Sequence, residues 1–141
     1  MGNRILVVED DNSIREMLTF ALEMEGFTVD ISKNGIEALD ILDKESRISF
    51  VLTDYEMPVM DGLELTKKIR EHKNYNQIPI IITTSINDNN LKINFYKYGA
   101  NDIILKPILH EDLINMFNSV IISLEEMTRV NYLMVHGVEM I

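Results

Sequence analysis

Short apolar runs alternate with amphipathic segments along most of the chain. The runs are short and rich in β-branched residues, as expected for strands rather than helices. They predict strands over residues 4–8, 27–32, 50–54, 80–84 and 102–105. The segments that follow them carry apolar residues at helical spacing. A β-α unit repeated five times predicts an α/β domain with a parallel, doubly wound sheet and helices on both faces.

The first helix has the clearest pattern. Its predicted buried stripe consists of Ile14, Met17, Leu18, Ala21 and Leu22. Ser13 with Glu16 has the spacing of a capping box, while Asn12 and Asp11 are alternative caps. Gly26 is expected to end this helix.

The later helices are less uniform. Ile36, Leu39 and Leu42 mark the second helix, and Leu65 with Ile69 marks the third. The fourth, over residues 88–98, is the weakest because it is rich in asparagine, a poor helix former.

The last helix is expected to start near His110, with apolar positions Leu113, Phe117, Val120, Ile121 and Leu124. Residues 1–124 are therefore predicted to form the domain. Residues 125–141 read as an extension of the last helix or a tail, and an apolar strip for a partner is the alternative.

Composition narrows the function. The 141 residues suffice for one domain and carry a net charge of -10 with no cysteine. Disulfides and thiolate metal sites are excluded, and direct nucleic-acid binding by this domain is not expected from an acidic chain. No apolar run approaches membrane-spanning length and no signal peptide is visible, so we expect a cytoplasmic protein without a membrane segment.

Polar residues with compatible chemistry stand at the ends of four predicted strands. They are Asp10, Asp11, Asp54, Thr84 and Lys106. The carboxyl ends of parallel strands lie along one edge, where open α/β sheets bind ligands, so these residues are expected to form one site. Three converging aspartates repel each other, and a hard cation such as Mg²⁺ would relieve this.

This set suits phosphoryl transfer. A carboxylate beside Mg²⁺ can attack phosphorus and form an aspartyl phosphate. The transferred group needs cationic and hydrogen-bonding partners, and Lys106 and the Thr84 hydroxyl can supply them. Taken singly, Lys106 reads as a surface lysine and Thr84 as an ordinary strand residue, but their joint placement favours a site.

The same residues lie in motifs that resemble those of a bacterial two-component response-regulator receiver domain, similar to chemotaxis regulators. The resemblance covers about residues 3–124 and rests on Ile5-Leu-Val-Val-Glu-Asp-Asp11, Leu52-Thr-Asp54, Met57-Pro-Val-Met-Asp-Gly-Leu-Glu-Leu65, Ile78-Pro-Ile-Ile-Ile-Thr-Thr-Ser85, Gly99-Ala100 and Lys106-Pro107. It implies a flavodoxin-like sheet of five strands in the order 2-1-3-4-5.

The resemblance also implies roles. Asp54 is the phosphoacceptor, Thr84 the hydroxyl that moves toward the phosphoryl group, and Lys106 the lysine that pairs with it. The implied Mg²⁺ ligands are Asp10, Asp11, Asp54 and the backbone carbonyl of Glu56. Implied partners are a sensor histidine kinase or phosphotransfer protein and a downstream effector, with a homodimer left open.

Three further positions bear on the resemblance. The Lys106–Pro107 bond is usually cis in the family. Ile103 stands where the family usually has a Tyr or Phe that moves when the domain switches. The resemblance therefore does not carry over this aromatic signal on the face formed by the fourth helix and fifth strand. Glu56 and Ile86 hold positions that tune phosphoryl lifetime, and Glu56 could orient a hydrolytic water or repel it.

Two other functions share part of this residue set. A phosphorylation-independent pseudo-receiver would share the fold, although the complete set of polar residues argues against it. A Mg²⁺-dependent phosphohydrolase would place its nucleophile at the first strand with a second Asp two residues on, and Asp10-Asp11 lacks that spacing. The expected protein is a signalling switch that is an enzyme only toward its own phosphorylation and dephosphorylation.

Overall fold

The computed structural model describes residues 4–115, 118, 119 and 129. One compact unit comprises residues 2–108, and a second begins at Leu109. The elements of the first unit are β1 (Arg4–Val8), α1 (Asn12–Met24), β2 (Thr28–Ser32), α2 (Gly35–Lys44), β3 (Ile48–Asp54), α3 (Gly62–Glu71), β4 (Ile80–Thr84), α4 (Asn89–Lys97) and β5 (Asp102–Leu105). Every predicted strand is present, although β3 begins two residues earlier and β2 one residue later than predicted.

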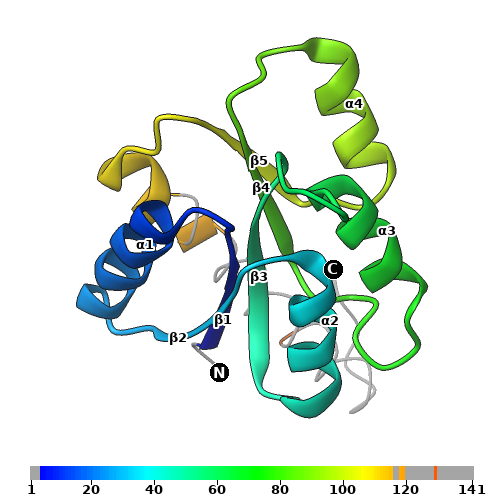
Figure 1. Cartoon of the computed structure of the whole chain (residues 1–141), viewed down its shortest axis with the longest axis horizontal. Helices are drawn as coiled ribbons and strands as arrows, with labels where there is room; N and C mark the ends of the chain where they lie inside the picture. The colour runs from blue at the N-terminus through cyan, green and yellow to red at the C-terminus, as the bar shows by residue number, and fades with distance from the viewer. Residues whose placement is uncertain (1–3, 116–117, 120–128, 130–141) are drawn as a thin grey trace. The chain divides into compact units, whose positions relative to one another are not determined.

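The described strands form a single parallel sheet in the order β2-β1-β3-β4-β5 (Figure 1). This is the predicted order, in which the chain moves outward from β1 to one edge and returns to build the other. α1 lies on one side of the sheet and α2 and α3 on the other (Figure 1). The fold is therefore the predicted doubly wound, flavodoxin-like arrangement.

Both faces of the central strands are covered. Ile80, Ile81 and Ile82 are all fully buried, so alternate side chains of β4 enter two different cores. The larger core joins the sheet to α2, α3 and α4 through Ala38, Leu42, Leu65, Ile69 and Phe95. On the other face α1 buries Leu18 and Leu22.

Four helices begin at an Asp or Asn side chain that accepts the N–H three residues later. The pairs are Asp11 with Ile14, Asn34 with Glu37, Asp61 with Glu64, and Asp88 with Leu91. For α1 the structure thus selects Asp11 among the three predicted cap candidates, and the cap leaves its carboxylate committed to the helix.

The predicted stripe of α1 is wrong at one position. Met17 is 51% exposed, whereas Arg15 is only 7% exposed. Arg15 is buried because its guanidinium donates to the Glu9 carbonyl oxygen at 2.8 Å and to the Asn12 side chain. A polar interaction with the strand end, which an apolar pattern does not show, adds Arg15 to the buried face that Leu18 and Leu22 form.

α4 is anchored by a single fully buried side chain, Phe95, whose ring packs edge-on against Tyr55 with centroids 4.9 Å apart. Ile103 is half-buried beside this core and pairs with Ile82 across β4 and β5. The weak apolar pattern of α4 thus corresponds to a helix with one main anchor.

In the second unit, residues 110–115 are helical, so the last helix begins at the predicted His110. The predicted apolar positions Phe117, Val120, Ile121 and Leu124, and the segment 125–141, lie outside the described residues, apart from Arg129. The boundary at residue 124 stays a prediction. No helix in the described part of the chain is both long and apolar enough to cross a membrane.

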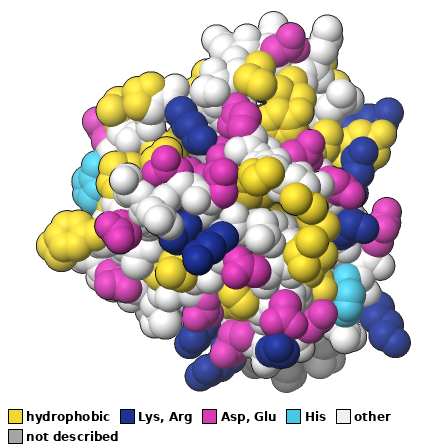
Figure 2. Space-filling view, in the orientation of Figure 1, with side chains coloured by type: hydrophobic (Ala, Val, Ile, Leu, Met, Phe, Trp, Pro, Cys, Tyr) yellow, Lys and Arg dark blue, Asp and Glu magenta, His cyan; other side chains and the backbone are white. Residues whose placement is uncertain are grey.

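Charged side chains of both signs are mixed over the face seen in Figure 2, with acidic groups numerous. Lys and Arg stand among Asp and Glu there, as expected for an acidic, solvated surface.

Candidate functional site

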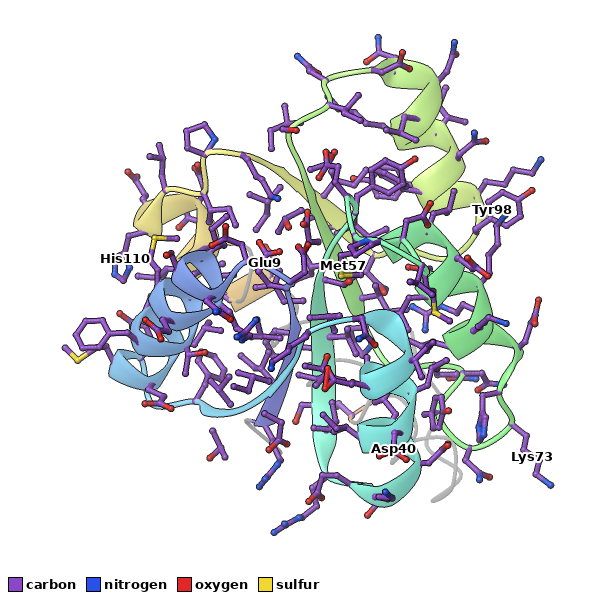
Figure 3. The ribbon with its side chains drawn as sticks, viewed as in Figure 1. Glu9, Asp40, Met57, Lys73, Tyr98 and His110 are labelled. Carbon is purple, nitrogen blue, oxygen red and sulfur yellow. The ribbon has the colours of Figure 1, made fainter. Side chains whose placement is uncertain are left out.

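The sheet register brings four strand ends to one edge. Asp54 pairs with Thr83, and Thr84 pairs with Leu105, the residue before Lys106. β1 ends at Val8, level with Thr53. The residues that close or follow these strands therefore meet, and Figure 3 shows Glu9 just past the end of β1.

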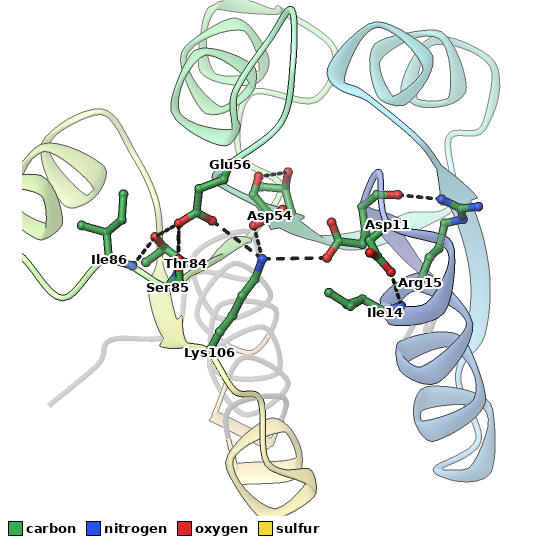
Figure 4. A network of polar contacts seen from close by, with 11 residues as sticks. Asp11, Ile14, Arg15, Asp54, Glu56, Thr84, Ser85, Ile86 and Lys106 are labelled. Carbon is green, nitrogen blue, oxygen red and sulfur yellow. Dashed lines mark hydrogen bonds and ion pairs between the residues drawn. The ribbon is translucent and has the colours of Figure 1, made fainter.

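Asp54 and Lys106 form the centre of the site. The Lys106 Nζ donates to Asp54 Oδ1 at 2.7 Å, and Asp54 is only 4% exposed (Figure 4). Burial raises the pKa of the Asp54 carboxyl, and the Lys106 ammonium opposes that rise. Burial also disfavours the ammonium, but the hydrogen bond to Asp54 together with the negative charges of Asp54, Glu9 and Glu56 outweighs this and raises the pKa of Lys106. The pair therefore holds a carboxylate and an ammonium in contact in a largely dry position.

A cluster of carboxylates adjoins the pair. Oxygen atoms of Glu9, Asp10 and Asp54 lie within 4.8 Å of one another. Burial, followed by the nearness of Asp54, raises the pKa of Glu9 to about 8. Glu9 Oε2 is buried without a hydrogen-bond partner. Clustered acidic oxygens with an unpaired buried member fit a hard divalent cation, which prefers oxygen ligands.

The acidic pair that faces Asp54 differs by one residue from the predicted pair. Glu9 belongs to the cluster, whereas Asp11 Oδ1 accepts the N–H of Ile14 at 3.0 Å as the cap of α1. Asp10 is common to both pairs. The sequence prediction did not include Glu9, which is only 2% exposed. Its position directly after a buried strand was the feature of the sequence that could have indicated a site residue.

Thr84 lies at the site, but its hydroxyl is engaged by Glu56. Thr84 Oγ1 donates to Glu56 Oε1 at 2.7 Å and accepts the N–H of Ile86 at 3.1 Å. Ser85 donates to the same Glu56 oxygen through its N–H and its hydroxyl, both at 3.0 Å. Burial alone would raise the pKa of Glu56, but the interactions with Thr84, Asp54 and Ser85 together outweigh it and lower the pKa to about 2. Glu56 is therefore ionised at neutral pH.

Two backbone features of the loops around the site shape it. The Lys106–Pro107 bond is cis, as the resemblance implied. At Gly62 an added Cβ would lie 2.4 Å from the Asp54 carbonyl oxygen, so only glycine lets α3 begin this close to the end of β3.

Comparisons with known proteins identify the family to which a chain with this fold and site belongs. The family model of the response regulator receiver domain matches residues 5–118. The chain therefore belongs to the receiver domain family, whose members act in two-component phosphorylation signalling. Receiver domains are signalling domains that interact with histidine kinases and downstream effectors, and they bind Mg²⁺ at an acidic site.

Individual relatives agree. The chain is similar to the transcriptional regulatory protein SrrA of Staphylococcus aureus, with 36% identity over 114 residues, covering 81% of this chain and 46% of that protein. It thus spans about half the length of the curated relatives it matches.

Solved structures give the same result. The chemotaxis protein CheY4 of Vibrio cholerae is 31% identical with a TM-score of 0.80, covering 85% of this chain and 99% of that one. The receiver domain of a Pseudomonas aeruginosa sensor histidine kinase is 29% identical with a TM-score of 0.77, covering 86% and 98%. That structure has a magnesium ion coordinated in its active site cleft.

Proposed function

We propose that Asp54 accepts a phosphoryl group from a histidine kinase phosphodonor and that this modification switches the domain between two states. The contact that carries the proposal is the 2.7 Å bond between Lys106 Nζ and the buried Asp54 carboxylate. In the transfer, an Asp54 carboxylate oxygen attacks phosphorus while the bond from phosphorus to the donor breaks. The leaving group keeps that electron pair, and an aspartyl phosphate remains. Attack by water would restore the carboxylate.

The residues around Asp54 have separate tasks. The Lys106 ammonium compensates the charge of the transferred group, and the Thr84 hydroxyl can donate to one of its oxygens. Mg²⁺, when bound, would neutralise negative charge on the phosphoryl oxygens. We assign its carboxylate ligands to Glu9, Asp10 and Asp54, with the backbone carbonyl of Glu56 as a further ligand. Asp11, predicted from sequence, is the competing assignment.

We also propose α4 and β5 as the output face toward a partner. Ile93 and Tyr96 on α4 are 62% and 50% exposed, and the Tyr96 hydroxyl donates to Asp102 of β5 at 3.3 Å. The β4–α4 loop connects this face to Thr84 and contributes Ile86, which is 42% exposed. A shift of Thr84 toward phosphate would pull directly on that loop, and Ile103 would adjust only its packing.

The test is labelling with a small phosphodonor. The full chain is incubated with acetyl phosphate and Mg²⁺, and intact mass and peptide mapping follow the modification. One phosphoryl group on Asp54, absent from Asp54→Asn, is expected. Labelling that persists in Asp54→Asn would refute the acceptor, and an unlabelled wild type would favour a pseudo-receiver. Hydrogen exchange of the two forms should differ mainly between Thr84 and Lys106.

A further inference from the structure

One carboxylate oxygen of Glu56 collects the donors that a phosphoryl group at Asp54 would require. Glu56 Oε1 accepts the Thr84 hydroxyl, the Ser85 N–H and the Ser85 hydroxyl at 2.7–3.0 Å. Figure 4 shows these bonds converging on Glu56, beside Asp54 and Lys106. The other oxygen, Oε2, lies 3.7 Å from Lys106 Nζ. An anion surrounded by a hydroxyl, an amide and an ammonium is the environment that a bound phosphoryl oxygen uses.

These donors have little capacity to spare. The Thr84 hydroxyl has one proton, and that proton is directed at Glu56 while its oxygen accepts from Ile86. Lys106 is already shared between Asp54 at 2.7 Å, Glu56 at 3.7 Å and Glu9 at 3.9 Å. A phosphoryl group can therefore engage Thr84 only if Thr84 first leaves Glu56.

Charge acts in the same direction. A phosphoryl group on Asp54 brings additional negative charge next to the ionised Glu56. Glu56 Oε2 is buried without a hydrogen-bond partner, so once Oε1 loses its donors only the 3.7 Å ion pair with Lys106 would hold the side chain, and the phosphoryl group competes for that ammonium as well. The side chain is 33% exposed, which gives it a route to water. Phosphorylation should thus expel Glu56 from the Thr84–Ser85 corner.

We propose that the Glu56 side chain is an internal competitor of the Asp54 phosphoryl group: it holds Thr84 and Ser85 in the unphosphorylated arrangement and opposes the phosphorylated one. The inference rests on the proposed function, since it concerns regulation of the same site. Glu56 is here a positioning residue that acts through Thr84 and Ser85. Its role differs from both predicted ones, because the oxygen that faces Thr84 is saturated and leaves no lone pair directed at a water.

The experiment measures binding of beryllium trifluoride, a non-covalent phosphoryl analogue, to the full chain with saturating Mg²⁺. Glu56→Gln keeps the size of the side chain and replaces the charged acceptor by a neutral one. The concentration of beryllium trifluoride that half-saturates the protein should fall about tenfold in this variant. Hydrogen bonds to charged groups are roughly twice as strong as neutral ones, so a neutral glutamine holds Thr84 and Ser85 less tightly than Glu56 does. In the unliganded variant, amide exchange at Ser85 should be faster than in wild type.

Two further variants separate the effect of the Glu56–Thr84 hydrogen bond from the effect of the Glu56 charge. Glu56→Asp keeps the charge but shortens the side chain, and should also bind the analogue more tightly than wild type. In the Thr84→Val background, which lacks the hydroxyl but keeps the shape, the gain from Glu56→Gln should shrink to about threefold or less, the part due to lost repulsion. Equal gains in both backgrounds, or wild-type affinity in Glu56→Asp, would overturn the competitor role.

The failures are distinguishable. If the wild type binds no analogue at Asp54, the proposed function is refuted and the competition with it. If the wild type binds and Asp54→Asn does not, but Glu56→Gln binds like wild type, the proposed function stands and this inference alone is refuted.

Discussion

Lys106 Nζ and Asp54 Oδ1 lie 2.7 Å apart although 52 positions separate the two residues in the chain. The parallel sheet makes this contact, because β3 and β5 flank β4 and all three end at the same edge. The ammonium also lies 3.9 Å from Glu9 and 3.7 Å from Glu56, so a single cation balances three carboxylates.

Replacing Lys106 should separate phosphoryl transfer from metal binding. Lys106→Met keeps the aliphatic stem and removes the charge, so labelling of Asp54 by acetyl phosphate should slow by about tenfold or more. Mg²⁺ affinity should stay the same or rise, because a positive charge leaves the acidic cluster. Both are measurable on one preparation by intact mass and calorimetry. A folded variant that lost Mg²⁺ binding would make Lys106 part of the metal site instead.

Two conservative substitutions should decide which aspartate binds the metal. Asp10→Asn should largely abolish the rise in melting temperature that Mg²⁺ produces, because it removes a charged ligand of the cluster. Asp11→Asn should retain that rise, since asparagine caps a helix as well as aspartate does. Melts with EDTA and with Mg²⁺ provide the measurement. Loss of the metal response in Asp11→Asn alone would restore the ligand assignment made from sequence.

Glu9 should make the metal-free protein less stable as pH rises. Its pKa is about 8 in the folded state against an ordinary value of 4.5, so the native state holds a proton that the unfolded state has released. Stability from this group is complete below about pH 4.5 and is lost as pH rises to about 8.

The slope is at most about 1.4 kcal/mol per pH unit, and Glu9→Gln should remove it. Urea unfolding in EDTA at several pH values between about 5 and 8, where Glu9 is protonated in the folded state but not in the unfolded state, measures this slope. Glu45→Gln is the control: the bonds from Arg47 lower the pKa of Glu45 to about 2, so its titration falls outside this range. If Glu9→Gln keeps the wild-type slope, another group is responsible.

Val59 should be a site where glycine stabilises the fold. This β-branched residue has φ +70° and is 87% exposed, so it bears backbone strain without contributing to the core. The left-handed conformation costs roughly 1–2 kcal/mol, and glycine returns about 0.5–1 kcal/mol of that as unfolded-state entropy. Val59→Gly should therefore gain about 0.5–1 kcal/mol in chemical denaturation. Val59→Ala retains the Cβ and should gain little, whereas a destabilised Val59→Gly would disprove the strain.

Arg70 should be an important structural residue away from the site. Its guanidinium donates to the carbonyls of Ile78 and Gly99 at 2.6 and 2.7 Å and to Asn101 Oδ1 at 2.9 Å. It thereby ties α3 to the segments that lead into β4 and β5. Arg70→Met removes these donors from the Ile78 and Gly99 carbonyls, while Asn101 Oδ1 keeps its bond from the Ile80 N–H, and should cost on the order of 2 kcal/mol of unfolding free energy.

Arg70→Lys should not restore the lost stability, because a single ammonium cannot reproduce a planar group with several donors. Full recovery by lysine would show that charge, rather than geometry, is what the site requires.

The sequence by itself determined the elements and their order. Strand bounds follow from runs such as Ile80–Thr84, and a chain of β-α units leaves little choice of architecture because parallel strands need crossover connections. The meeting of Asp54, Thr84 and Lys106 also follows from sequence, since each closes or follows a parallel strand.

Only the tertiary structure decided how the side chains at those strand ends divide their partners. Asp10, Asp11 and Glu9 are adjacent in the chain, and no periodicity tells which carboxylate turns to Asp54 and which caps α1. That choice depends on the direction of the backbone between β1 and α1, which the bond from Arg15 to the Glu9 carbonyl helps to set. Likewise, Glu56 reaches Thr84 across 28 positions, so its role depends on packing between two loops rather than on any local pattern.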